Sequence, residues 1–155
     1  MSNSREFTIG QARLGVLWAA SCSWIGHLLG RLGRSHGAYS AVETDDGVIE
    51  YRHNGLLEWL PRQPAAIVFG NVVNYATNID PESIMRRYDG TGYVQLREHE
   101  LVHVRQYRCW GPFFLPAYFL AELVAVIKLG RGVNAFEQHA DDQSARQEFA
   151  RKNLR

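Results

Sequence analysis

This sequence of 155 residues is poor in cysteine and has almost no net charge. Its two cysteines, Cys22 and Cys109, are too few for a disulfide framework and lack the spacing of a zinc knuckle. The formal net charge is only +1 and the basic residues are scattered, which argues against a nucleic-acid partner. With 12% aromatic and 21% charged residues, the chain is not disordered and is long enough to bury a core as one domain. A reducing compartment, the cytoplasm, is the default localisation.

Long uncharged runs are also scarce, and the first one lies near the N-terminus. Residues 14–30 contain no Asp, Glu, Lys or Arg, and Arg13 and Arg31 flank them. These 17 residues only reach the lower limit for a membrane span. We predict a helix within residues 1–36 that packs on the core; a membrane anchor over residues 14–30 and a signal peptide are the alternatives. The large apolar residues at helical spacing form the expected packing stripe: Leu14, Trp18, Cys22, Ile25, Leu29 and Leu32.

One motif stands out against these absences: His99-Glu-Leu-Val-His103 on a helix predicted over residues 93–107. One helical turn separates the histidines, so both imidazoles project from one face, as two ligands of a metal ion require. Glu100 is rotated about 100° around the helix, where it can reach a water without being a ligand. This donor set makes Zn2+ the expected cofactor, the alternative being a chance match on a polar helix face. Gln106 shares the face of the histidines and is a candidate supporting residue.

A catalytic zinc normally has a third protein ligand, and the suitable cluster downstream lies in residues 134–142. Glu137 and Asp141 are four residues apart, on one face of a helix predicted over residues 134–155. Glu137 would bind the metal while Asp141 accepts a hydrogen bond from the far nitrogen of a ligand histidine. His139 is the rival ligand, but we favour Glu137 because it alone has such a partner at i+4. Alternatively, these are ordinary acidic residues in the first turns of a helix.

The pattern His99-Glu100-x-x-His103 followed by Glu137-x-x-x-Asp141 resembles the zincin metallopeptidases, specifically the gluzincins, the thermolysin-like branch with a glutamate as third ligand. It is also similar to small, poorly characterised bacterial domains carrying HELxHxxQ. The resemblance implies that His99, His103 and Glu137 bind zinc, that Glu100 is the general base and that Asp141 orients a ligand histidine.

The chain departs from the family pattern at two points. Phe136 and Ala140 stand where the family often has Asn and Ser, and no later residue matches the family's oxyanion-stabilising His or Tyr. His139 and Tyr118 are the candidates for that role, although a tyrosine in an apolar segment is more often a core residue.

Residues 37–80 are predicted to form a small twisted sheet. Short β-prone runs flank Asp45-Asp46-Gly47, which is a hairpin signal. Residues 65–75 form the best strand, in which a glycine indicates a bulge or a close backbone approach. The resemblance to zincins implies that the strand before the motif helix is a sheet edge that binds extended substrate, and a plain internal strand is the alternative. The candidate edge residues are Gly70, Asn71, Val72, Val73 and Asn74.

These features together predict a single α+β, zincin-like domain over residues 1–155, with a buried apolar helix over residues 113–127 between the motif helix and the third-ligand helix. The expected function is zinc-dependent hydrolysis of peptide bonds in a peptide or protein substrate, with Glu100 as general base. The alternative is a non-catalytic, zinc-stabilised binding or membrane-associated module in which His139 fills the fourth coordination position.

Overall fold

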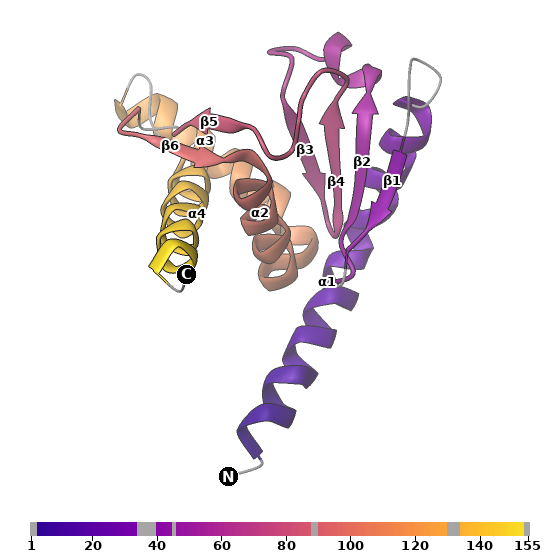
Figure 1. The fold of residues 1–155 in the computed structure, drawn as a ribbon, viewed down its shortest axis with the longest axis vertical. Helices are drawn as coiled ribbons and strands as arrows, with labels where there is room; N and C mark the ends of the chain where they lie inside the picture. The colour runs from indigo at the N-terminus through magenta and orange to yellow at the C-terminus, as the bar shows by residue number, and fades with distance from the viewer. Residues whose placement is uncertain (1–2, 34–39, 45, 88–89, 130–133, 154–155) are drawn as a thin grey trace. The chain divides into compact units, whose positions relative to one another are not determined.

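The computed structural model describes residues 3–33, 40–44, 46–87, 90–129 and 134–153, which form an α+β protein (Figure 1). The chain divides into two compact units. The first unit comprises Met1–Ile79 and Val104–Pro112, and the second comprises Asp80–His103 and Phe113–Arg155. Helix α2 (Leu96–Trp110) therefore contributes its first half to the second unit and its second half to the first.

The first unit contains a four-stranded sheet in the order β1-β2-β4-β3. Strand β2 pairs antiparallel with β1 and parallel with β4, and β3 pairs antiparallel with β4. The hairpin predicted around Asp46 and Gly47 is confirmed by the pairing of β1 with β2, whereas Asp45 lies outside the described residues. A short 3-10 helix, η2 (Gly55–Trp59), follows β2. The strands are β1 (Ser40–Glu43), β2 (Ile49–Asn54), β3 (Ala66–Phe69) and β4 (Val72–Ala76).

The single strand predicted over residues 65–75 is in fact the β3–β4 hairpin, with Gly70 and Asn71 in its turn. Gly70 has a φ of +63° and approaches helix α1 so closely that a Cβ there would lie 2.3 Å from the Ala19 carbonyl oxygen. The predicted close backbone approach is therefore correct. The prediction of a substrate-binding edge at Gly70–Asn74 is wrong, because β4 is an interior strand with β2 on one side and β3 on the other.

Helix α1 (Asn3–Gly33) confirms the N-terminal helix but packs with a different face from the one predicted. Leu14, Trp18 and Leu32 are exposed. The close contact is made by glycines: a Cβ at Gly30 would lie 2.5 Å from the Tyr51 ring, so only glycine permits this approach. Figure 1 shows α1 running along the sheet and continuing beyond it at its N-terminal end. The buried face consists of small residues: Ala19, Cys22, Ser23, Gly26, Gly30 and Gly33.

Three asparagines of the first unit fasten α1 to the sheet by hydrogen bonds to backbone carbonyls of the helix. The Asn54 amide donates to the Leu29 carbonyl at 3.2 Å, and the Asn71 amide donates to the Val16 carbonyl at 3.0 Å. The Asn74 amide donates to the Gly26 carbonyl at 3.1 Å. The amide of Asn54 also lies 3.0 Å from the side-chain oxygen of Asn74. We refer to Asn54, Asn71 and Asn74 as the asparagine cluster; all three are buried.

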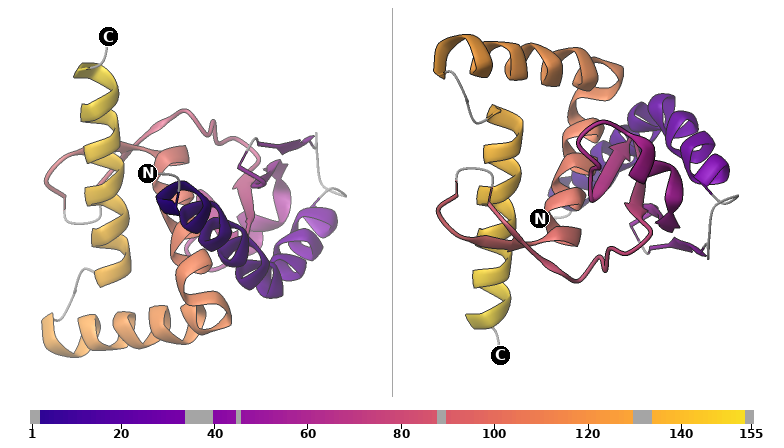
Figure 2. Two further views of the ribbon diagram at one scale, coloured as in Figure 1. Left: turned by 90° about the horizontal axis from the view of Figure 1, so that it is seen from below. Right: turned by 90° about the horizontal axis from the view of Figure 1, so that it is seen from above.

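The second unit contains a two-stranded antiparallel sheet and several helical segments. Strand β6 pairs with β5, so the motif helix begins at Leu96 and not at residue 93 as predicted. Strand β5 was not foreseen within the polar connector. Helix α4 contacts both β6 and α3, and Figure 2 shows α3 lying across the start of α4. The elements are β5 (Ile84–Arg86), β6 (Tyr93–Gln95), the first half of α2, part of η3 (Gly111–Phe113), α3 (Phe114–Leu129) and α4 (Ala135–Asn153).

Helix α3 corrects the prediction of a buried apolar helix. Phe114 and Ala125 are buried, but Phe119, Leu123 and Ile127 are exposed. The helix packs by one face only, so its other face is apolar and exposed.

Candidate metal centre

The structure brings together His99 and His103 from the first half of α2 and Glu137 from the first turn of α4. All three side chains are buried, and one ligand atom from each lies within 4.8 Å of the others. The first half of α2 and the whole of α4 belong to the same unit, in which they lie side by side (Figure 1). The motif spacing accounts for the two histidines, because residues four apart share one helix face. Glu137 completes the set from the opposing helix.

The distances between the ligand atoms suit a tetrahedral metal ion. His99 Nε2 lies 3.1 Å from His103 Nε2 and 3.1 Å from Glu137 Oε2. His103 Nε2 lies 3.4 Å from Glu137 Oε1. A tetrahedron with metal–ligand bonds of about 2.0–2.1 Å has edges of about 3.3–3.4 Å. The two distances to Glu137 end on different carboxylate oxygens, and one ligand atom from each of the three residues lies within 4.8 Å of the others, so two nitrogens and one carboxylate could hold a metal ion here.

Asp141 defines which nitrogen of His99 faces the other ligands. Its Oδ1 lies 3.0 Å from His99 Nδ1, and the carboxylate is fully buried. A proton on Nδ1 is donated to this carboxylate, which leaves the lone pair of Nε2 directed at the cluster. Because Asp141 is one turn beyond Glu137 on α4, the i, i+4 pair predicted from sequence performs both roles on one helix face.

Glu137 is held by residues that the sequence argument did not assign to it. The Tyr118 hydroxyl of α3 donates to Glu137 Oε1 at 2.6 Å. Asn134 caps α4, since its side-chain oxygen accepts from the Phe136 N–H at 2.9 Å. The Asn134 amide also donates to the Tyr118 carbonyl at 3.2 Å. The third ligand is thus tied to α3 by a side chain and by a helix cap. An N-cap asparagine before an acidic first turn is a readable signal for the cap, but not for its partner on α3.

The charges in the cluster favour a cation. Burial, the largest influence, would lower the pKa of His99, but hydrogen bonds with Asp141 and Glu137 and nearby negative charge raise it to about 10. Burial, again the largest influence, would lower the pKa of His103, but its hydrogen bond with Glu137 and the negative charge of Glu137 and Glu100 together raise it. Burial would raise the pKa of Glu137, yet the hydrogen bonds to His103 and His99 lower it. The pocket therefore stabilises positive charge, whether it is supplied by protons or by a metal ion.

Glu100 is buried beside this cluster and is not one of its ligands. Burial raises the pKa of its carboxyl, and the nearby positive charge of His103 and His99 opposes that shift. A carboxyl with a raised pKa holds a proton more readily than an exposed carboxyl. The role of Glu100 as general base stays a prediction.

The remaining predicted site residues have different outcomes. His139 is exposed on α4 and is not among the three ligands, so the choice of Glu137 over His139 agrees with the geometry. Gln106 is buried in the half of α2 that belongs to the first unit, whereas the ligands belong to the second, and its supporting role stays a prediction. Tyr118 contacts a ligand, and its role as an oxyanion stabiliser stays a prediction.

No protein-family model, curated protein or solved structure matches this chain.

Proposed function

We propose that the protein is a zinc-dependent peptidase whose metal is held by His99, His103 and Glu137. The observation that carries the proposal is the convergence of His99, His103 and Glu137, with one ligand atom of each within 4.8 Å of the others, beside the buried, non-ligating carboxyl of Glu100. Two histidines and a glutamate form one of the known donor sets of catalytic zinc, which supplies Lewis acidity and activates water for hydrolysis.

The residues of the chain have separate tasks in this proposal. The Glu100 carboxylate accepts a proton from the attacking water and returns it to the leaving amine. Asp141 holds His99 in one tautomer and one ring orientation. Tyr118 holds Glu137 Oε1 and limits rotation of that carboxylate. These two hydrogen bonds keep the ligands arranged for a metal before one arrives.

The number of ligands favours catalysis over a structural zinc. A structural site is closed by four protein ligands, whereas a catalytic site has three and an open position. Among the described residues the cluster contains three, and His139, the residue expected to close it, is exposed on α4. This supports an open coordination position in the proposed enzyme.

A peptidase needs a site that binds its peptide substrate. The small sheet of the second unit has an exposed edge that could bind a peptide, which the interior strand β4 lacks. Strand β5 pairs with β6 on one side, and in the described part of the chain no strand pairs with its other side. Such an edge can add an extended peptide by backbone hydrogen bonds. Strand β6 leads directly into α2 and contacts α4, so this sheet and the ligands belong to one unit.

The test compares two equivalent substitutions on α2. Glu100→Gln removes the base at nearly constant size, and Glu98→Gln makes the same change at another buried position of that helix. Zinc-loaded proteins are incubated with a diverse peptide mixture, and cleavage is measured by mass spectrometry together with zinc content. We expect Glu100→Gln to lose activity by about 100-fold or more while zinc content stays unchanged, and Glu98→Gln to remain active. Absence of cleavage by the zinc-loaded wild type, or full activity of Glu100→Gln, would contradict the proposal.

A further inference from the structure

Helix α3 differs from an ordinary surface helix because its apolar side chains are exposed and its polar side chains bond to the protein. Between residues 113 and 127, all side chains that the structure describes as exposed are apolar. Phe119 is 65%, Leu123 55% and Ile127 73% exposed. The polar side chains of Tyr118 and Glu122 instead bond inward, to Glu137 and Asn134. A helix that is apolar on its solvent side requires a further apolar environment.

Helix α1 shows the same reversal in the other unit. Its small residues pack on the sheet, while Leu14 is 67% and Trp24 62% exposed, together with Leu17 and Leu28. Two helices of separate units thus carry outward apolar faces. We call these the outer face of α1 (Leu14, Leu17, Trp24, Leu28) and the outer face of α3 (Phe119, Leu120, Leu123, Ile127).

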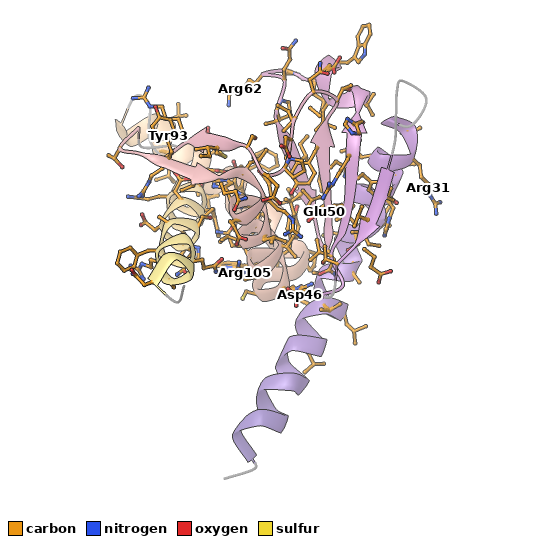
Figure 3. All side chains as sticks on the ribbon, viewed as in Figure 1. Arg31, Asp46, Glu50, Arg62, Tyr93 and Arg105 are labelled. Atoms are coloured by element: carbon orange, nitrogen blue, oxygen red, sulfur yellow. The ribbon has the colours of Figure 1, made fainter. Side chains whose placement is uncertain are left out.

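The distribution of charged residues in the sequence around both faces indicates which apolar environment would cover them. Residues 14–30 carry no charge, and residues 109–127 carry only Glu122. In sequence, Arg13 and Arg31 flank the first run and Lys128 follows the second, whereas Arg108 before the second run bonds to Asn71 and Asp46. Figure 3 shows Arg31 extending outward from the last turns of α1. Uncharged apolar faces whose flanking sequence carries basic residues match a bilayer with anionic headgroups.

A second copy of the chain fits these faces less well. Protein interfaces have a polar rim and about one hydrogen bond per 100–200 Å², whereas every exposed side chain described between residues 113 and 127 is apolar. A bilayer can cover each apolar face without a complementary shape. We propose that the outer faces of α1 and α3 dock the protein on the surface of an anionic lipid bilayer.

The docking is peripheral, with α3 lying along the surface. By length and composition, Leu96–Ile127 is the one stretch of the described chain that could cross a membrane, and only 17% of its apolar window is buried. However, Gly111, with a φ of +57°, interrupts the helix between α2 and α3. The 16 residues of α3 alone extend about 24 Å at 1.5 Å per residue, less than the roughly 30 Å of a hydrocarbon core.

The experiment is flotation of the full-length protein with vesicles, which is independent of peptidase activity. Vesicles of phosphatidylcholine alone are compared with vesicles containing phosphatidylglycerol. We expect binding to the anionic vesicles that weakens at high salt. The double variant Phe119→Ser/Leu123→Ser should bind at least about tenfold more weakly, since it removes two apolar side chains from the bilayer contact. Phe149→Ser is the matched control, because Phe149 is 71% exposed on α4 and lies outside both faces.

Circular dichroism and zinc content establish that each variant is folded. Wild-type protein that floats with neither vesicle, or a double variant that binds as well as wild type, overturns the proposal. So does a concentration-dependent dimer, measured by ultracentrifugation, that the double variant abolishes, because the faces would then bind a second copy. Resistance of the bound protein to alkaline carbonate extraction would overturn the peripheral arrangement.

Discussion

The two units each bury a polar cluster, and the clusters differ in kind. The asparagine cluster of the first unit consists of neutral amides that donate to backbone carbonyls of α1. The cluster of His99, His103 and Glu137 brings two imidazoles and a carboxylate together, and these become converging acceptors when the imidazoles lose a proton. Buried amides with hydrogen-bond partners are a common part of a folded structure. Converging acceptors are costly unless a cation or protons separate them. The difference teaches that burial alone does not mark a candidate metal site, whereas ionisable groups that converge on one point do.

We expect the largest difference between the two clusters when a metal ligand is removed, because zinc affinity should then fall. Glu137→Ala should weaken zinc binding by more than about 100-fold, because even residues that only support a ligand are worth about 10–100-fold. His103→Ala should do the same. His139→Ala, an exposed change on the same helix as Glu137, should leave affinity nearly unchanged. A zinc competition titration at one pH measures all three. If His139→Ala lowered zinc affinity more than Glu137→Ala, the third ligand would be His139 and not Glu137. The resemblance to the thermolysin-like branch would then fail.

A smaller effect is expected where a ligand is only misoriented. Asp141→Asn keeps the shape of the side chain but weakens its hydrogen bond with His99 Nδ1, so zinc affinity should fall about 10–100-fold. Asp142→Asn is the adjacent control, since Asp142 pairs with Arg87 and not with a ligand. The same titration applies. Equal losses from the two variants would show that general negative charge, and not the bond to His99, sets the affinity.

The asparagine cluster should respond in stability and not in metal binding. Asn74→Ala removes the donor to the Gly26 carbonyl and the acceptor for Asn54, so the free energy of unfolding should fall by about 1–3 kcal/mol. The exposed Asn78→Ala should change it little. Urea denaturation and zinc titration together provide the measurement. Weaker zinc binding in a folded Asn74→Ala protein would mean that the two clusters do not differ as described.

The smallest effect concerns pH. In the metal-free protein the pKa of His99 is raised from 6.5 to about 10. The charged imidazole therefore stabilises the fold fully below pH 6.5, and this stabilisation is lost as the pH rises toward 10. The melting temperature of metal-free protein should fall across that interval, and less so with zinc bound, because zinc takes the place of the proton. Metal-free protein that becomes more stable between these pH values would contradict the assignment.

The sequence predicted the site better than the fold around it. His99, His103, Glu137 and Asp141 were predictable because each pair lies one turn apart on one helix, and helical periodicity alone places such residues together. The contact of Tyr118 with Glu137 was not, because it joins two helices whose packing no local pattern encodes. Strand β5 has three residues, too few for an alternating pattern to emerge from a polar connector.

The packing face of α1 was mispredicted for a physical reason. A helix between a protein core and water buries the face that carries its large apolar side chains. In α1 the glycines permit close approach to Tyr51 and Val72, and asparagines bond to the helix backbone, so small residues form the contact. The choice between the two faces depends on what lies outside the helix, which the sequence does not state.

Helix α2 carries a consequence for how the protein unfolds. It is one helix from Leu96 to Trp110 with no internal proline or glycine, and its two halves belong to different units. Such a helix frays from its ends more readily than it breaks in the middle. A metal held by His99 and His103 therefore also favours the helical state of the half in which Arg108 donates to Asn71. By mass action, the unfolding midpoint of the first unit should then depend on the concentration of free zinc, although the ligands lie in the second unit.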